Sequence, residues 1–387
     1  MKIEAWYSEN FESDLSGRYI TLNHINPLLK KYKNNFEISI LGTSELGKNI
    51  SLIKIGSGKK RILAWSQMHG NESTTTKSIF DFLKFISQKE VLQDEISNFL
   101  KNNTLFLVPM LNPDGAASYT RNNGNLVDLN RDAQDLSQKE SKLLMNLFNS
   151  IQPDLCLNLH GQRTIFGLNT GNPATVSFLS PASNKEREVT PSRKIAMSLI
   201  VIMNADLQKY IPNQIGRYDD SFNSNCFGDY FQMKEVPVIL FEAGHFKEDY
   251  QREKTRKYIF YSLLSVLGIG NSVKDQGNYK DYFSIPENQK NYKDIIIRNV
   301  RIKSCNGIVS IAIQFSEKLI EGKIKLIPLI DEVGDLDHYF AHKEIVGKGN
   351  VVLVNSQEEV EIGTIVSEIV NKNDNSLVYF NENNFLF

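Results

Sequence analysis

The chain has 387 residues, 41% of them hydrophobic and 23% charged, as in a globular protein with one large and one smaller domain. Its 44 Lys and Arg residues nearly balance its 45 Asp and Glu residues, so the overall charge argues against nucleic acid or a membrane surface as a partner. Three cysteines far apart in the chain argue against a disulfide framework and fit a reducing compartment. With no signal-peptide pattern and no membrane-spanning apolar run, the sequence predicts a cytoplasmic protein.

Short apolar segments alternate with amphipathic segments over the first 270 residues. Such alternation predicts an α/β fold with a mixed, mostly parallel sheet flanked by helices. The expected strands, in chain order, are 36–41, 50–55, 61–66, 104–109, 155–159 and 236–241. The expected helices are 23–32, a helix that begins near residue 74, 137–151, 195–210 and 253–267.

The composition changes near residue 270, which predicts a division of the chain. Residues 1–270 are expected to form the α/β domain. Residues 271–293 are rich in Asn, Lys, Tyr, Gly and Pro and are typical of a linker. Residues 294–387 contain further strand-like runs separated by turn residues, which predict a small β-rich domain of unassigned role.

Polar side chains gather directly after several apolar strands. His69 and Glu72 follow one strand, residues 112–115 follow another, His160 follows a third and Glu242 a fourth. In open α/β sheets the site lies beyond the carboxyl ends of the strands, so these groups are expected to converge. Catalytic zinc uses three protein ligands of this kind together with a water molecule. The His-x-x-Glu spacing alone is weak evidence, because a histidine that merely caps a helix would produce it too.

A longer pattern makes the interpretation more specific. It consists of His69-x-x-Glu72, Asn112-Pro113-Asp114-Gly115, Arg121, Asp128-Leu129-Asn130-Arg131, His160 and Glu242. In order and spacing these pieces resemble the zinc carboxypeptidases, over roughly residues 17–268. The C-terminal β-rich module lies outside the resemblance.

The resemblance implies one zinc ion per chain, held by His69, Glu72 and His160. It also implies that Glu242 is the general base, which takes a proton from the attacking water and passes it to the leaving amine. The alternative for Glu242 is a buried carboxylate neutralised by a neighbour such as His245.

Four further residues receive roles from the same resemblance. Arg121 would stabilise the oxyanion, although an exposed loop arginine is the alternative. Asn130 and Arg131 would grip the terminal carboxylate of the substrate, to which a guanidinium can donate two parallel hydrogen bonds. Asp128 would orient the imidazole of His69. These roles imply a substrate with a free carboxylate, either a peptide or an N-acyl amino acid.

The resemblance also suggests substrate contacts at two further places. Tyr218 falls about where the family has a substrate-contacting tyrosine, and Arg217 beside it is an equally good candidate. Arg163, two residues after Gly161, stands near a position where a small hydroxyl residue is more usual in the family. A cation there would favour an acidic side chain or a second carboxylate in the substrate.

The resemblance thus implies a metallocarboxypeptidase, a zinc-dependent hydrolase that cleaves the C-terminal amino acid from a peptide by Glu-assisted attack of zinc-bound water. Two other functions remain open. One is an amidohydrolase of the same superfamily that acts on N-acyl amino acids or cell-wall peptides. The other is a non-catalytic peptide-binding protein that contains zinc, although such a protein would not need a carboxylate at Glu242. The oligomeric state is left open.

Overall fold

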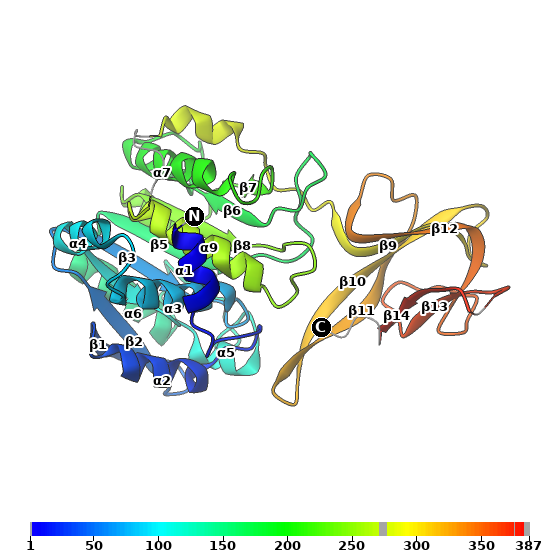
Figure 1. The fold of residues 1–387 in the computed structure, drawn as a ribbon, viewed down its shortest axis with the longest axis horizontal. Helices are drawn as coiled ribbons and strands as arrows, with labels where there is room; N and C mark the ends of the chain where they lie inside the picture. The colour runs from blue at the N-terminus through cyan, green and yellow to red at the C-terminus, as the bar shows by residue number, and fades with distance from the viewer. Residues whose placement is uncertain (1, 271–276, 375, 383–387) are drawn as a thin grey trace. The chain divides into compact units, whose positions relative to one another are not determined.

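The computed structural model describes residues 2–270, 277–374 and 376–382. Within this part of the chain the fold divides into two compact units. The first contains Met1–Gln162 and Ala174–Asn288, and the second contains Arg163–Pro173 and Gln289–Phe387. Each unit is built on its own β-sheet (Figure 1).

The first unit contains a mixed sheet in which the described strands follow the order β1-β2-β4-β3-β5-β8-β6-β7. Strands β4, β3, β5 and β8 run parallel to one another at its centre, which agrees with the predicted α/β class. The strands are β1 (Glu37–Thr43), β2 (Asn49–Ile55), β3 (Lys60–Ser66), β4 (Asn103–Val108), β5 (Leu155–Gly161), β6 (Val176–Leu179), β7 (Ile215–Arg217) and β8 (Val238–Ala243).

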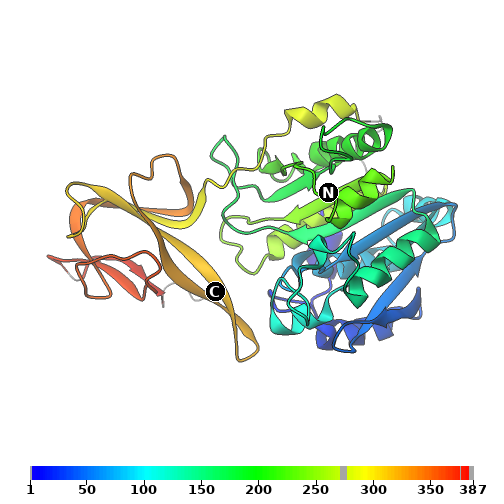
Figure 2. The same cartoon turned by 180° about the vertical axis from the view of Figure 1, so that it is seen from behind.

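Helices cover both faces of this sheet, as Figures 1 and 2 show from opposite sides. The described helices of the unit are α1 (Lys2–Asn10), α2 (Leu22–Tyr32), α3 (Thr74–Ser87), α4 (Gln93–Asn102), α5 (Pro113–Ser118), α6 (Lys139–Ile151), α7 (Pro191–Leu207), α8 (Phe227–Met233) and α9 (Glu253–Val266). Two short 3-10 helices, η1 (Leu129–Arg131) and η2 (Tyr279–Ser284), lie in the connections. None of the helices in the described ranges has the length and apolarity needed to cross a membrane.

The central strands send alternate side chains into two separate apolar cores. Ile62 and Ala64 of β3 pack in the core that also holds residues of α3, α7 and α9, whereas Leu63 and Trp65 pack against α6 and α8. Because successive side chains of a strand point to opposite faces, near-continuous apolar runs are required wherever both faces are covered. This requirement explains why the central strands appear in the sequence as short, nearly continuous apolar runs.

A buried ion pair fastens the N-terminal segment to this core. The Arg256 guanidinium on α9 donates to both carboxylate oxygens of Asp81 on α3, at 2.7 and 2.6 Å, and both side chains are fully buried. The Tyr7 hydroxyl and the Glu12 backbone N–H donate to the same carboxylate, at 3.1 and 2.8 Å. Helix α1 and the following loop are therefore held by groups more than 60 residues away in the chain.

Removing one member of this pair is expected to destabilise the first unit strongly. Arg256→Met leaves the Asp81 carboxylate buried without its cation, a change that typically costs about 3–5 kcal/mol of unfolding free energy. Denaturant unfolding checks the value. The double variant Asp81→Leu/Arg256→Met is expected to recover part of the loss, because no lone charge remains. A loss below about 1 kcal/mol in Arg256→Met would contradict this interpretation of the pair.

The second unit contains a sheet whose described strands follow the order β11-β10-β9-β12-β13-β14. Only β9 and β12 pair in parallel, and the other neighbours are antiparallel. The strands are β9 (Tyr292–Arg301), β10 (Val309–Ile320), β11 (Lys323–Gly334), β12 (Phe340–Val354), β13 (Glu368–Asn371) and β14 (Val378–Asn381). The β-rich character expected of this region is therefore present. His338 and His342, which have helical spacing in the sequence, lie in the approach to β12 and within β12.

The observed division differs from the one expected at residues 270 and 293. Residues 163–173 join the second unit, because Gly167 and Gln289 exchange backbone hydrogen bonds of 2.9 Å. Residues 277–288, expected to be linker, belong to the first unit, where the Tyr282 hydroxyl is buried and accepts from the Ser180 N–H at 3.2 Å. The linker residues 271–276 lie outside the described residues. Hydrogen bonds between residues this far apart in the chain cannot be predicted from a local sequence pattern, so the unit boundaries were not predicted.

Candidate metal centre and its surroundings

The loop after β3 carries His69 and Glu72 and is held by the turn at the start of α5. The Asn112 side chain accepts from the Gly115 N–H at 2.8 Å and donates to the Met68 carbonyl at 3.0 Å, which joins the two loops. They approach so closely that a Cβ on Gly70 would lie 1.9 Å from the Gly115 carbonyl carbon. Glycine is therefore required at position 70, between the two candidate ligands.

His69, Glu72 and His160 form a compact cluster. One ligand atom from each lies within 4.8 Å of the other two, and there is no other such group of three among the described residues. The Nδ1 atoms of the two histidines are 3.1 Å apart, and each lies 2.9 Å from an oxygen of Glu72. Ligands about 2.0–2.2 Å from a tetrahedral zinc ion lie roughly 3.3–3.6 Å from one another, so this donor set matches zinc in chemistry, and its atoms lie a few tenths of an ångström closer together than ligands of a bound ion would.

Asp128 fixes which nitrogen of His69 faces the cluster. Its Oδ1 lies 3.1 Å from Nε2 of His69. Burial opposes the ionisation of Asp128, but the hydrogen bond from His69 and the charge of Arg121 outweigh it and hold the pKa of Asp128 below its usual range. An ionised carboxylate only accepts hydrogen bonds, so Nε2 of His69 donates to Asp128 and Nδ1 is the ring nitrogen that faces Glu72 and His160. The structure places Asp128 in contact with His69, and its role in orienting that imidazole stays a prediction.

His160 and Glu242 come from neighbouring strands of the sheet. They are directly paired in the parallel register of β5 and β8, so both side chains lie on the same face. Burial lowers the pKa of His160, which favours the neutral imidazole that metals bind.

Glu242 is buried, and its Oε2 has no hydrogen-bond partner among the described residues. Burial, followed by the charge of Glu72, raises the pKa of Glu242 well above its ordinary value. A carboxyl group left unpaired at such a cost is typical of a functional site rather than of a structural ion pair. The alternative for Glu242 was a carboxylate neutralised by a basic neighbour. Among the described residues, no basic side chain donates a hydrogen bond to its Oε2.

Arg121 reaches the cluster from the loop that follows α5. Its Nε donates to Asp128 at 2.9 Å, and its Nη1 lies 3.3 Å from Nδ1 of His69 and 3.6 Å from Glu72. The side chain is 46% exposed, so the guanidinium can face solvent or substrate on its other side. Arg121 is an exposed loop arginine, as the alternative considered for it states, but one that also contacts the cluster, and its role at the oxyanion stays a prediction.

Asn130 and Arg131 lie on η1, directly after Asp128. The Asn130 side chain accepts from the Phe227 N–H at 3.2 Å, which fixes the turn against the start of α8. The exposed Arg131 donates through Nη1 to its neighbour's carbonyl at 2.7 Å and to Sγ of Cys226 at 3.0 Å. Burial raises the pKa of Cys226 to about 11, so its thiol stays neutral beside Arg131.

The three remaining substrate candidates differ in position. Tyr218 follows β7, and burial followed by the charges of Glu242 and Glu72 raises the pKa of its hydroxyl. The Arg217 guanidinium instead lies over the Tyr282 ring at 5.5 Å and pairs with Glu287, which favours Tyr218 of the two. Arg163 belongs to the second unit, so its role stays a prediction.

Sequence reasoning missed the residues that tie the strand ends together behind the cluster. The buried Arg252 guanidinium donates to the carbonyls of Ala243, the last residue of β8, and of Gln162, just beyond β5, at 3.2 and 3.1 Å. The Gln162 side chain donates to the Ala174 carbonyl at 2.7 Å and to the Ser177 hydroxyl at 3.1 Å. No local pattern in the sequence marks these residues, because each bridges segments distant in the chain.

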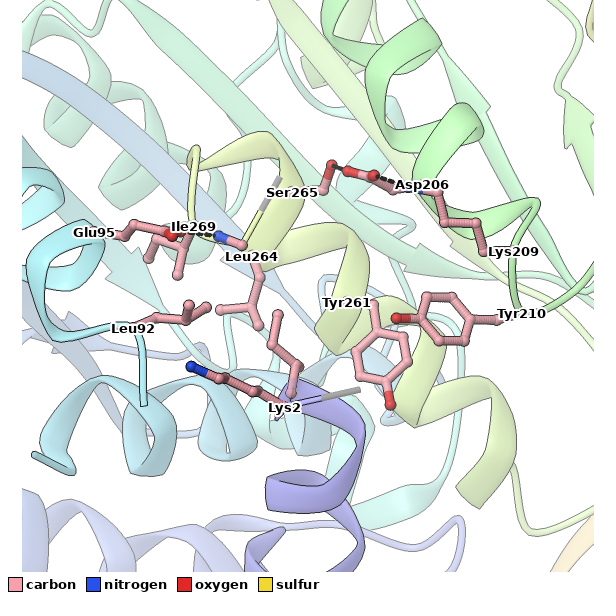
Figure 3. A pocket seen from close by; sticks show the side chains of 12 residues that line it. Lys2, Leu92, Glu95, Asp206, Lys209, Tyr210, Tyr261, Leu264, Ser265 and Ile269 are labelled. Carbon is pink, nitrogen blue, oxygen red and sulfur yellow. Dashed lines mark hydrogen bonds and ion pairs between the residues drawn. The ribbon is translucent and has the colours of Figure 1, made fainter. Parts of the chain in front are cut away.

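A separate pocket of about 370 Å³ lies between α1, α7 and α9 (Figure 3). Its polar groups largely bind one another: Asp206 accepts from Ser265 at 2.7 Å and pairs with Lys209 at 3.0 Å. None of the described residues that line it is a candidate from the sequence.

Comparison with known proteins agrees with this geometry. Residues 21–135 match the sequence model of the zinc carboxypeptidase family. Human carboxypeptidase D is 25% identical over 154 residues, which cover 34% of this chain and 11% of that protein. The gamma-D-glutamyl-L-diamino acid endopeptidase 1 of Lysinibacillus sphaericus is 38% identical over 80 residues, which cover 19% of this chain and 20% of that protein. The chain thus spans only a small part of these curated relatives.

The fold gives a second comparison. The crystal structure of a metallo-carboxypeptidase from Burkholderia cenocepacia superimposes with a TM-score of 0.52 at 15% identity, over 63% of this chain and 67% of that one. At this identity the likeness concerns the fold alone. The chain is therefore similar to the zinc carboxypeptidases in sequence over residues 21–135 and similar to a metallo-carboxypeptidase in fold.

Proposed function

We propose that the protein is a zinc-dependent hydrolase that releases the C-terminal amino acid of a peptide. One observation carries the proposal. His69, Glu72 and His160 gather within 4.8 Å, and the unpaired Glu242 stands in register beside His160. Hydrolysis of an amide needs an activated water and a group that moves its proton, and this arrangement offers residues for both tasks.

The donor set supports zinc as the cofactor, with one ion per chain. The imidazoles of His69 and His160 and the ionised carboxylate of Glu72 are ligand groups that zinc prefers. Bound there, zinc would supply Lewis acidity, which makes water a nucleophile at neutral pH and polarises the scissile carbonyl.

Glu242 would move the proton. Its pKa, raised by burial and by Glu72, suits a base that takes a proton from the attacking water and returns it to the leaving amine. Arg121 would donate to the oxygen on which negative charge develops, because its guanidinium already lies beside two of the ligands. Tyr218, close to Glu242, would contact the substrate over the reacting bond.

Asn130 and Arg131 would hold the terminal carboxylate of the substrate. The Arg131 side chain is exposed, and its hydrogen-bond partner Cys226 is a neutral thiol, so the guanidinium is accessible to an anion. A guanidinium can bind a carboxylate through two parallel hydrogen bonds, which would restrict the enzyme to free C-termini.

Arg131→Ala provides the test. Charge-assisted hydrogen bonds contribute about 1.5–3 kcal/mol, so kcat/KM for a peptide with a free C-terminus is expected to fall by roughly 10–100-fold, mainly through KM. The zinc-loaded protein is assayed on a pair of peptides that differ only in a free or amidated C-terminus. The exposed Arg301→Ala in the second unit is the matched control. Equal cleavage of both peptides by the wild type would rule out the role proposed for Arg131.

A second candidate function is favoured by the 38% identity to the gamma-D-glutamyl-L-diamino acid endopeptidase. In that case the scissile amide would join the side-chain carboxyl of a D-glutamyl residue to a diamino acid, as in a cell-wall peptide. The same residues would perform the chemistry. Faster cleavage of a γ-D-glutamyl-diamino acid peptide than of an all-L peptide of equal length would favour this candidate, and the reverse order would favour the first.

A further inference from the structure

The loop between Arg121 and Asp128 is built around one buried side chain. Asn123 is 2% exposed, although its neighbours in this polar loop are partly or largely exposed. Its Oδ1 accepts from the backbone N–H groups of Asn125 and Val127, both at 3.0 Å, and its own N–H donates to the Val127 carbonyl at 2.9 Å. These bonds close the loop upon itself.

The same side chain joins the loop to the start of α6. Its Nδ2 donates to Oε1 of Gln138 at 2.9 Å and to Oε2 of Glu140 at 3.3 Å. Glu140 is buried and uses its other oxygen to accept from the Glu45 N–H at 3.1 Å, so it is a fixed acceptor. An asparagine at position 123 therefore satisfies both the loop and the helix, through an acceptor oxygen and a donor nitrogen.

The hydrogen bonds of the Asn123 side chain, which anchor the loop to α6, matter more for the position of Arg121 than for that of Asp128. The Asp128 side chain is fixed independently of Asn123, because it accepts from the Asn130 N–H at 2.9 Å and caps η1. Arg121 is 46% exposed, and its chain neighbours are fixed by the Thr120 N–H bond to the Gly115 carbonyl on one side and by Asn123 on the other. Loss of one anchor would let the guanidinium move away from the cluster.

We propose that Asn123 is a positioning residue that holds Arg121 against the metal centre. This inference rests on the proposed function, in which Arg121 stabilises the oxyanion. Asn123 would act on Arg121 only by fixing the shape of the loop. Its side-chain amide carries no charge, and its hydrogen bonds go to the loop backbone and to Gln138 and Glu140.

Asn123→Asp tests the proposal with almost no change in shape. The new carboxylate removes the two donated bonds and faces the carboxylate of Glu140. Loss of a single oxyanion donor typically costs about 10²–10³ in kcat, so a displaced Arg121 is expected to lower kcat by about 10–100-fold with KM changed less than about threefold. Adding Glu140→Gln to the same chain restores a donor opposite the new carboxylate and is expected to recover most of the loss. Asn102→Asp, which removes two exposed hydrogen bonds on α4, is the matched control.

A double-mutant cycle separates positioning from general damage to the fold. In an Arg121→Ala background, Asn123→Asp is expected to change kcat by less than about threefold, because the residue it positions is gone. Full additivity of the two effects would overturn the inference. If wild type and Arg121→Ala hydrolyse peptides equally, or not at all, the proposed function fails instead.

Limited digestion with trypsin gives a readout that needs no activity. Cleavage after Arg121 is expected to be at least roughly tenfold faster in Asn123→Asp than in the wild type, and to slow again with Glu140→Gln. An unchanged cleavage rate at this bond would overturn the inference, whatever the kinetics.

Discussion

Glu242→Gln is expected to lower kcat by about 10²–10⁴-fold while the protein still binds one zinc ion per chain. The amide has nearly the shape of the carboxyl group but cannot take the proton of the attacking water. Because Glu242 is buried beside His160 and its Oε2 has no hydrogen-bond partner among the described residues, the substitution is expected to disturb the fold little. Zinc content by mass spectrometry and peptide hydrolysis at neutral pH check both parts of the expectation.

Glu235→Gln makes the same chemical change on an exposed side chain just before β8 and serves as the control. It is expected to keep wild-type kcat. Activity in Glu242→Gln within a few fold of the wild type would mean that another group moves the proton, and the role proposed for Glu242 would be lost.

His160→Ala is expected to have the second large effect, on the metal itself. Loss of a partner that supports a zinc ligand typically reduces metal affinity by about 10–100-fold, and loss of a ligand should cost more than this. Asp128→Asn, which weakens the hydrogen bond that orients His69, is expected to fall within the range of about 10–100-fold. Competition with a chelating dye measures both affinities, and peptide hydrolysis at limiting zinc should fall in the same order.

The exposed His338→Ala, in the second unit, controls for general loss of a histidine. Equal zinc affinity in His160→Ala and wild type would place the metal elsewhere and would remove the basis of the mechanism.

Much of the α/β fold could be predicted because its central strands are covered on both faces. Strands β3, β5 and β8 appear as short apolar runs, and each ends where a polar candidate begins. Helix α1 was not predicted, because its burial depends on contacts such as Tyr7 with Asp81, which are distant in the sequence. The sequence also did not predict that residues 163–173 belong to the second unit, because this depends on the pairing of Gly167 with the distant Gln289.

The site shows the same contrast between local pattern and distant contact. His69, Glu72 and His160 stand in the sequence with family spacing, and the structure brings them together. Asn123 lies in a loop with several asparagines and looks like an ordinary solvent-exposed residue. Its burial arises only when Gln138 and Glu140, at the start of α6, close over the loop.

The most direct test of the central claim is a zinc titration of the metal-free protein with simultaneous measurement of amino-acid release from a peptide. We predict that the rate rises in proportion to bound zinc and stops rising at one ion per chain, and that Glu242→Gln takes up the same single ion without gaining comparable activity. Hydrolysis that is complete without zinc, or zinc uptake that leaves the wild type inactive on every peptide with a free C-terminus, would contradict the claim.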